Sequence, residues 1–344
     1  MNNNKRTLIT SRTDKCGKSV FLYGRFLCAV MTVLVAISAS GCSRGYISSY
    51  NDNINRNSFS LTEVSADYIG KVPLFAAEIC VPGEGAALDI GSNKASGLFD
   101  LENGKTLIEN NITKKIYPAS TTKIMTALLA IKYGKMDTML KASSRVANLE
   151  WEAQRIGIEK GDRMTLDQAL HYLMVYSAND AAVMIAEEIG GGSYDRFIEM
   201  MNEEAARIGA TRTHFVNPHG LHSKNHYTTA YDLFLIFQEC LKYEEFRELI
   251  RYDYYSTVFH DKDGNIRAIE IPSTDSYLLG SVKAPENIRV IGGKTGTTDQ
   301  AGSCLIILST NESGKEFVSV VMGAPDSGSL YKSMNRLLKK ERGQ

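Results

Sequence analysis

The sequence has few of the residues that build covalent or metal cross-links. It contains six cysteines in 344 residues, and Cys16, Cys28 and Cys42 fall within its first 42 positions. Cys80, Cys240 and Cys304 remain, an odd number without the spacing of a metal site. We therefore expect small buried apolar residues here, with no metal and no cofactor.

The sequence also lacks a net charge, since 39 basic residues balance 39 acidic ones. Six of the basic residues, opposed only by Asp14, precede the apolar run Phe26–Ser40. The rest of the chain is therefore mildly acidic. This balance argues against nucleic acid as a partner.

No apolar run reaches the roughly 20 residues of a stable membrane span. Phe26–Ser40 is shorter, follows a basic start and ends in small residues, so residues 1–41 are predicted to be an export signal or membrane anchor. Ala39-Ser40-Gly41-Cys42 resembles a bacterial lipoprotein cleavage box, except that Ala39 stands where Leu is usual. Cys42 is thus a lipidation candidate, with uncleaved anchoring or ordinary cleavage as alternatives. Each alternative places the body outside the cytoplasm, tethered or released.

The remaining chain divides into a tether and one folded body. Residues 42–65 are polar and without apolar period, which is typical of a flexible linker, and residues 66–344 are predicted to be the catalytic domain. Asn103-Gly104 between two strand-like runs predicts a hairpin. Helical capping signals fall at Thr165, Asp180, Ser193 and Thr229.

This order of elements predicts an α+β fold, a sandwich in which helices flank a sheet. Strand-like patterns occupy residues 66–135 and 255–344, and helical patterns occupy 136–254. We expect a single antiparallel sheet built from both ends of the chain, with a helical region inserted between them.

The most distinctive stretch is Pro118 to Lys123 with the apolar run that follows. Pro118 discourages a preceding helix, and residues 124–131 are apolar on nearly all faces, as in a buried helix. Ser120 and Lys123 are three residues apart, so on a helix they share one face and a hydroxyl can meet an amine. Ser-x-x-Lys alone is weak evidence, since it recurs at Ser329 to Lys332.

Two further motifs follow in order. Ser177-Ala178-Asn179 lies in a break between two predicted helices, where side chains can project into a cleft. Lys294-Thr295-Gly296 occurs once, within a predicted strand. Together with Ser120 and Lys123, they form the set of motifs found in penicillin-recognising serine enzymes.

The chain resembles the serine-type D-alanyl-D-alanine carboxypeptidases, the low-molecular-mass penicillin-binding proteins with a β-lactamase/transpeptidase-like fold. The resemblance covers about residues 67–324. It includes four blocks, each extended beyond its minimal motif: 117–126, 177–182, 217–221, and 293–298 with 301–302.

The resemblance implies acyl transfer from peptidoglycan stem pentapeptides, with β-lactams as covalent inhibitors. Ser120 would be the nucleophile and Lys123 its base, Ser177 would relay a proton to the leaving amine, and Asn179 would orient the substrate. Lys294 and Thr295 would hold the terminal carboxylate, and Gly296 would keep the strand edge clear for the substrate. The backbone N–H groups of Ser120 and Thr297 would form an oxyanion hole.

Two rival functions share the motifs. A serine β-lactamase of the kind that uses a glutamate to activate water would need an acid in the following loop, but 205–238 holds only Asp232. We therefore predict slow release of a penicillin adduct. A non-catalytic β-lactam receptor would need a cytoplasmic transducer, for which the residues before Phe26 are too few. His219, His222 and His226 lack partners at metal-ligand spacing, so we expect no metal there.

Overall fold

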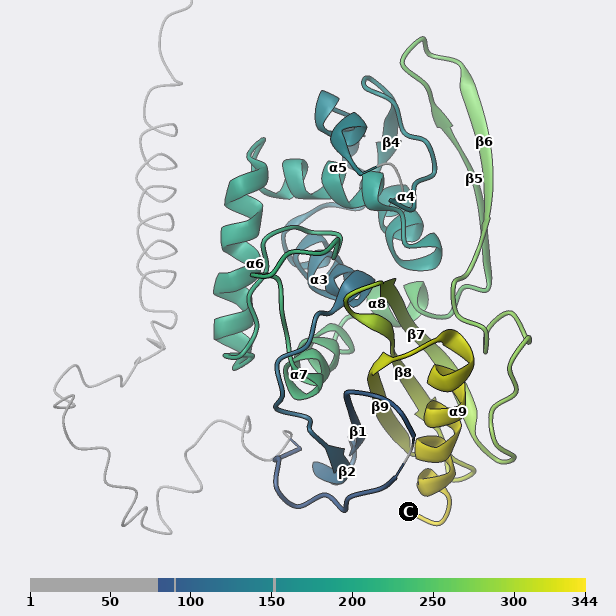
Figure 1. The fold of residues 1–344 in the computed structure, drawn as a ribbon. Coiled ribbons are helices and arrows are strands. Elements are labelled where there is room, and N and C mark those ends of the chain that lie inside the picture. The colour runs from purple at the N-terminus through teal and green to yellow at the C-terminus, as the bar shows by residue number, and fades with distance from the viewer. Residues whose placement is uncertain (1–79, 90, 151–152) are drawn as a thin grey trace, which may run out of the picture. The chain divides into compact units, whose positions relative to one another are not determined.

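The computed structural model describes residues 80–344 except 90 and 151–152 (Figure 1). The predicted export signal, tether and lipidation candidate Cys42 lie outside these residues. Among the described helices, none combines the length and apolarity needed to cross a membrane.

The main sheet has five antiparallel strands in the order β2-β1-β9-β8-β7. The predicted hairpin at Asn103-Gly104 is confirmed, because it joins β1 to β2 and Gly104 has a φ of 61° that suits glycine. Strand β7, which carries Lys294-Thr295-Gly296, lies at one edge. The strand bounds are β1 Ala95–Asp100, β2 Lys105–Asn110, β7 Arg289–Thr298, β8 Gly302–Thr310 and β9 Glu316–Ala324.

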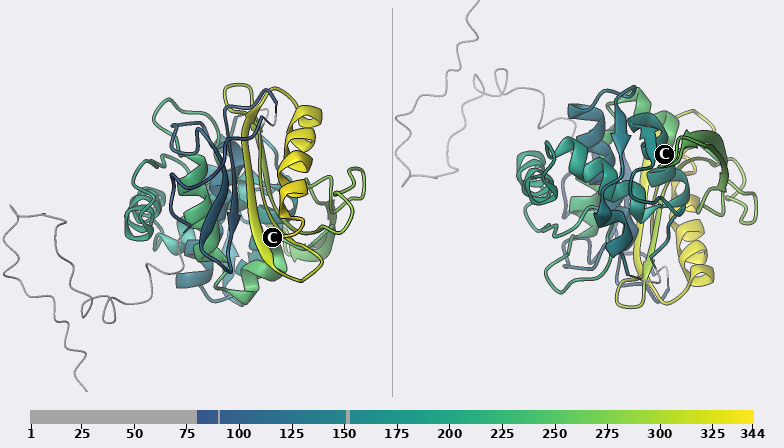
Figure 2. Two further views of the ribbon diagram at one scale, coloured as in Figure 1. Left: turned by 90° about the horizontal axis from the view of Figure 1, so that it is seen from below. Right: turned by 90° about the horizontal axis from the view of Figure 1, so that it is seen from above.

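Helices cover both faces of this sheet, as the edge-on view shows (Figure 2). In β8, Cys304, Ile306 and Leu308 belong to the core shared with α3 and α7, while Leu305 and Ile307 pack with α9 on the other side. Because both faces of the sheet are covered, β8 and β9 are buried at nearly every position, and most of their residues are apolar. The predicted α+β sandwich is confirmed.

Most of the described helices lie in the region between β2 and β5. Helix α3 is buried from Lys123 to Ala130, as the apolar run predicted. The helix bounds are α3 Lys123–Tyr133, α4 Leu166–His171, α5 Asn179–Ile189, α6 Tyr194–Ile208, α7 Ala230–Cys240, α8 Glu244–Leu249 and α9 Ser327–Leu338.

Three of the four predicted helix caps are confirmed. Thr165 and Gln168 form a reciprocal capping box, Ser193 accepts from Arg196 N, and Thr229 accepts from Asp232 N. The cap predicted at Asp180 is wrong. Helix α5 begins one residue earlier, at Asn179, and the Asp180 carboxylate mainly accepts backbone N–H groups of a neighbouring loop.

The prediction of a single sheet is also wrong. Strands β5 (Tyr254–His260) and β6 (Ile266–Pro272) pair with each other and, through β4 (Arg163–Thr165), with β3 (Met139–Lys141) in a second, four-stranded sheet. The local sequence pattern predicted strand β6. It did not predict the strands with which β6 pairs, because that pairing depends on how the whole chain packs. Both β5 and β6 expose one face, unlike the doubly covered strands of the main sheet.

Candidate active site

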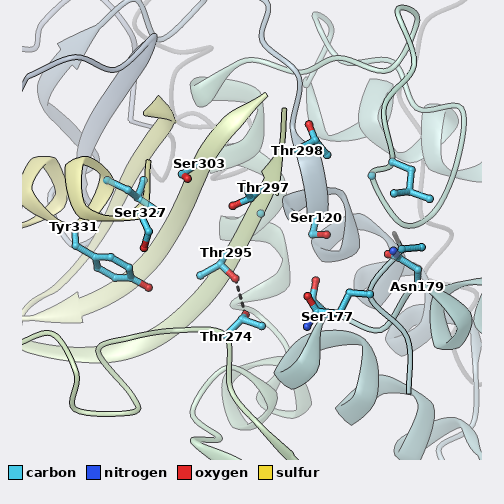
Figure 3. A pocket seen from close by; sticks show the side chains of 16 residues that line it. Ser120, Ser177, Asn179, Thr274, Thr295, Thr297, Thr298, Ser303, Ser327 and Tyr331 are labelled. Carbon is cyan, nitrogen blue, oxygen red and sulfur yellow. Dashed lines mark hydrogen bonds between the residues drawn. The ribbon is translucent and has the colours of Figure 1, made fainter. Parts of the chain in front are cut away.

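The three motifs meet at one cleft, where side chains from distant segments converge (Figure 3). Ser120 lies on one wall, Ser177 and Asn179 at the start of α5, and Thr295 to Thr298 along β7. The family resemblance implied that these motifs share one site.

Ser120 lies on a tight 3-10 turn, Ala119–Thr122, that runs directly into α3. Ala119 has a φ of 49°, a left-handed conformation that costs free energy in a non-glycine residue. Gly220, with a φ of 90°, packs so closely that a Cβ there would lie 1.9 Å from the Ala119 carbonyl oxygen. The strained turn is thus held from the side by a loop that only glycine allows to approach.

The Lys123 side chain is fully buried at the base of this turn. Its Nζ lies 2.9 Å from Ser120 Oγ, 2.6 Å from Asn179 Oδ1 and 2.7 Å from the His219 carbonyl oxygen. The carbonyl oxygen, and the amide oxygen in this orientation, can only accept. A neutral Lys123 amine would donate its two N–H groups to these two oxygens. Its lone pair would then point at the Ser120 hydroxyl. The contacts of Lys123 therefore suit a base for Ser120.

Electrostatics favours the neutral amine. Burial holds the pKa of Lys123 well below its ordinary value, and the positive charge of Lys294 lowers this pKa further. Asp180 acts in the opposite direction but contributes less.

Lys294 is the second buried lysine, and it points to Ser177. Its Nζ donates to Ser177 Oγ at 3.0 Å and to the Thr295 carbonyl at 2.9 Å. Ser177 ends a short π-helical turn, Tyr172–Tyr176, in the left-handed region at a φ of 68°. Burial lowers the pKa of Lys294 to about 7, and Asp275 partly opposes this.

Thr295 and Gly296 lie on the free edge of β7. Thr295 Oγ1 is 2.5 Å from Thr274 Oγ1, and Thr297 is exposed. A Cβ at Gly296 would lie 2.7 Å from Ser120 N and 2.8 Å from Thr121 N. The structure thus gives a second reason for glycine here: it lets β7 approach the turn that carries Ser120.

The polar residues of the cleft that sequence reasoning missed include Gln154, Thr274 and Tyr331. The Gln154 carbonyl accepts from Asn179 N at 2.8 Å, and its side chain donates to the Tyr176 carbonyl. None of the three belongs to a motif, so no local signal could have identified them. Trp151 lies outside the described residues.

The histidine-containing loop serves as a wall of the cleft. Asn217 Oδ1 accepts from Gly220 N at 2.7 Å, and His226 bonds through one ring nitrogen to Thr122 Oγ1 and through the other to Val216 N. Burial is the main cause that lowers the pKa of His226 to about 3, so this ring is neutral. No group of three or more potential metal ligands occurs in the described part of the chain.

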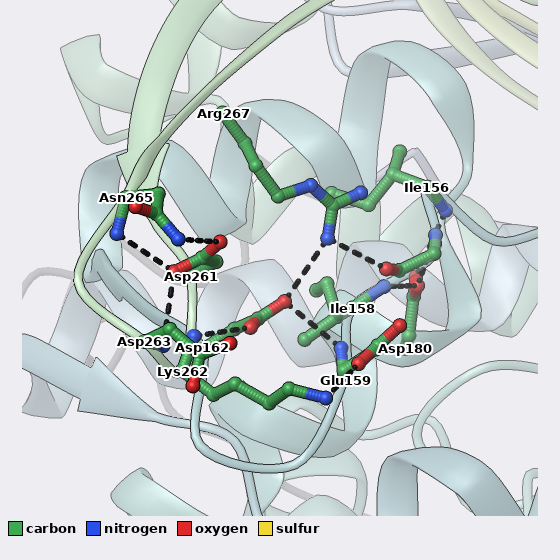
Figure 4. A network of polar contacts seen from close by, with 11 residues as sticks. Ile156, Ile158, Glu159, Asp162, Asp180, Asp261, Lys262, Asp263, Asn265 and Arg267 are labelled. Atoms are coloured by element: carbon green, nitrogen blue, oxygen red, sulfur yellow. Dashed lines mark hydrogen bonds and ion pairs between the residues drawn. The ribbon is translucent and has the colours of Figure 1, made fainter.

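A network of polar contacts supports the start of α5 (Figure 4). Asp180 accepts N–H groups from Gly157 and Ile158, each at 3.0 Å. Arg267 of β6 donates to the Gly157 carbonyl and to Asp162, which also accepts from Lys262 N. The second sheet is thereby linked to the segment that bears Gln154.

Comparison with known proteins agrees with this geometry. The model of the family described as D-alanyl-D-alanine carboxypeptidase matches residues 85–326. Similar curated proteins include the D-alanyl-D-alanine carboxypeptidases DacF of Bacillus subtilis, 33% identical over 238 residues, and DacC of Escherichia coli, 30% identical over 273 residues. These alignments cover 67% and 77% of this chain but 57% and 63% of the relatives. The chain thus spans somewhat more than half the length of these proteins.

Solved structures show the same fold. The crystal structure of the Streptomyces K15 DD-transpeptidase matches with a TM-score of 0.66 at 25% identity, covering 73% of this chain and 96% of that one. A penicillin-binding protein homolog from Mycobacterium tuberculosis matches with a TM-score of 0.64 at 27% identity, covering 76% and 95%.

Proposed function

Because the chain belongs to the D-alanyl-D-alanine carboxypeptidase family, we propose that it removes the terminal D-Ala of peptidoglycan stem pentapeptides through an acyl-enzyme on Ser120. The observation that carries this proposal is the environment of Lys123. A buried amine with a lowered pKa, two acceptors for its N–H groups and a hydroxyl 2.9 Å away supports the proposal that Lys123 is the general base.

In the proposed acylation, Ser120 Oγ bonds to the carbonyl carbon of the penultimate D-Ala while its proton passes to Lys123. The bond to the nitrogen of the terminal D-Ala then breaks, and Ser177 relays a proton to this departing amine. Asn179 holds Lys123 and orients the substrate amide. Water then attacks the ester on Ser120 and releases the shortened peptide, which restores the serine.

The terminal carboxylate is proposed to bind Lys294 and Thr295, with Thr274 as an added hydroxyl beside them. The N–H groups of Ser120 and Thr297 receive the developing oxyanion. Each such donor is typically worth about 3 kcal/mol of transition-state stabilisation. Gly296 allows the close approach of the two segments that bear these donors.

We propose that a penicillin forms a long-lived adduct, because its carboxylate imitates that of D-Ala. None of the described residues that line the cleft is an aspartate or a glutamate that could activate a deacylating water. This observation argues against a serine β-lactamase of the kind that uses a glutamate to activate water. A receptor that is only acylated would form the adduct without releasing D-Ala.

The proposed setting is the outer face of the cytoplasmic membrane, where the enzyme would act on the cell wall and so on cell shape. It rests on the basic and apolar composition of residues 1–41 and on Cys42 as the lipidation candidate. Membrane fractionation of cells that express the chain or Cys42→Ala tests it, since a lipid tether predicts loss of the variant from the membrane pellet.

The function is tested by intact-mass spectrometry with benzylpenicillin alongside D-Ala release from a peptide ending in D-Ala-D-Ala. Ser120→Ala is expected to abolish both the adduct and D-Ala release, because it removes the hydroxyl that lies beside Lys123 Nζ. Ser329→Ala removes the serine of the other Ser-x-x-Lys motif, which donates to Asp326 of its own helix cap and does not line the cleft, and both activities should persist. Penicillin labelling that survives Ser120→Ala would refute the assignment.

A further inference from the structure

A second hollow lies beside the cleft, and lysines and tyrosines line it. Tyr117 directly precedes the turn that carries Ser120, and Lys224 belongs to the loop that also supplies Gly220 and Leu221 to the cleft. The polar and aromatic lining, called the lysine pocket below, consists of Lys94, Lys114, Lys115, Tyr117, Lys224 and Tyr227.

Backbone hydrogen bonds hold the segments that carry Tyr117 and Tyr227 in the lysine pocket. Ile116 N donates to the Thr228 carbonyl at 2.8 Å, and Thr228 N donates back at 2.9 Å. Tyr227 exchanges a similar pair of bonds with His214, at 2.8 and 3.0 Å. Tyr117 and Tyr227 are therefore held by their backbone in a fixed relation to the turn that bears Ser120.

Two of the lysines are also held in place although they are exposed. The aliphatic part of Lys94 packs over Gly323, and its Nζ donates to the Gln300 carbonyl at 3.0 Å, just beyond the end of β7. Lys115 Nζ lies 4.1 Å from the centre of the Tyr227 ring. Such contacts reduce the side-chain entropy that ligand binding would otherwise cost.

Within the residues that the structure describes, the four lysines of the lysine pocket form no ion pair with an acidic side chain. Other lysines of the chain, such as Lys132, Lys262 and Lys315, form ion pairs, but none joins these four to an acidic side chain of the described residues. Asp299 precedes Gln300 but does not line the pocket. Outside the N-terminal 41 residues the chain has an excess of acidic residues, so four unopposed lysines are a local departure from its composition.

Clustered lysines bind carboxylates or phosphates as point charges, and tyrosines offer flat faces and hydroxyls to sugars or peptide. We propose that the lysine pocket binds anionic groups, carboxylate or phosphate, that the cell-wall polymer carries outside the scissile D-Ala-D-Ala bond. This inference rests on the proposed function for the nature of the polymer. The pocket would make the enzyme prefer anionic substrates to neutral ones of the same length.

The carboxylate source is tested with two synthetic pentapeptides ending in D-Ala-D-Ala that differ only in Glu or Gln at one upstream position. The ratio of their kcat/KM values for D-Ala release is expected to favour the Glu peptide. The ratio should fall about fivefold to tenfold in Lys115→Gln/Lys224→Gln at low ionic strength. Added salt should weaken the parent preference, because screening at 1 M reduces the Debye length to about 3 Å.

Inorganic polyphosphate, titrated against the same proteins, tests the phosphate source. Lys160→Gln/Lys339→Gln is the matched control, since it removes two exposed lysines that do not line either hollow. This control should keep both the parent peptide ratio and the parent polyphosphate affinity.

A loss confined to the peptide ratio assigns the pocket to carboxylates, and a loss confined to polyphosphate affinity assigns it to phosphates. If Lys115→Gln/Lys224→Gln matches the control in both measurements, the inference is overturned. A parent enzyme that releases no D-Ala from either peptide would instead refute the proposed function, while the polyphosphate titration would still test the pocket.

Discussion

At the scale of single residues, the cleft depends on two buried lysines that need opposite protonation states. In the proposed mechanism Lys123 acts as a base and must be neutral, whereas Lys294 binds a carboxylate and must be charged. Burial lowers the pKa of both lysines, and the charge of Lys294 lowers that of Lys123 further. The nearby Asp275 supports the charge of Lys294, since it opposes the effect of burial.

We therefore predict a bell-shaped pH profile for kcat/KM. Activity should rise with pH as Lys123 loses its proton and should fall above about pH 7 as Lys294 loses its charge. D-Ala release measured from pH 5 to pH 10 tests this. In Lys294→Arg the maximum should be lower, but the descending limb should move to higher pH because guanidinium does not deprotonate. If the descending limb of the profile stays at the same pH in Lys294→Arg, a group other than Lys294 causes the loss of activity.

At the scale of elements, the start of α5 is joined to the segment 153–158 through Asp180. The carboxylate accepts N–H groups from Gly157 and Ile158, while Asn179 N donates to the Gln154 carbonyl. Burial raises the pKa of Asp180, and hydrogen bonds from backbone N–H groups, first those of Ile158 and Ile156, oppose that effect. A single buried acid thus helps to position one wall of the cleft.

Asp180→Ala should therefore affect both stability and activity. The lost acceptor leaves buried N–H groups unpaired, which costs about 1–3 kcal/mol in the free energy of unfolding. Release of the segment should also slow acylation by benzylpenicillin. Urea unfolding and acylation kinetics measure these effects. Asp195→Ala, in the exposed first turn of α6, is the control and should change stability by less than about 0.5 kcal/mol. Equal behaviour of the two variants would contradict this role for Asp180.

At the scale of the whole molecule, the end of the chain is fastened to the middle of the main sheet. Glu341 is fully buried, and its Oε1 accepts from Ser309 Oγ of β8 at 2.9 Å and from Ser319 Oγ of β9 at 3.3 Å. Burial raises the pKa of Glu341 from 4.5 to about 8. The folded protein therefore retains a proton that the unfolded chain releases.

This difference predicts how stability depends on pH. Between about pH 4.5 and pH 8 the native state binds more protons at Glu341 than the unfolded state. The contribution of Glu341 to stability should therefore fall as pH rises, by up to about 1.4 kcal/mol per pH unit. Glu341→Gln keeps the acceptor oxygen and removes the titration, so its stability relative to the parent should grow with pH and level off above about pH 8.

Urea unfolding of both proteins from pH 5 to pH 9 measures this difference. Glu312→Gln, in an exposed turn, serves as the control and should follow the parent. If the Glu341→Gln and parent curves stay parallel over this range, Glu341 does not titrate as described.

The sequence by itself determined the features that depend on neighbouring residues. The spacing of Ser120 and Lys123 predicted their contact, since residues three apart share a helix face. The hairpin at Asn103-Gly104 and the caps at Thr165, Ser193 and Thr229 were equally local. Resemblance to a known family then placed the three motifs in one site, which the local patterns alone could not do.

Only the tertiary structure decided what surrounds these residues. Asn179 and the His219 carbonyl contact Lys123 from positions 56 and 96 residues away in the sequence. Lys294 donates to Ser177, which lies 117 residues away. The partners of β5 and β6, the contact of Thr274 with Thr295 and the inward turn of Asp180 were likewise beyond prediction. The physical reason is that periodicity reports which face of an element is buried, whereas the packing of the whole chain selects what that face meets.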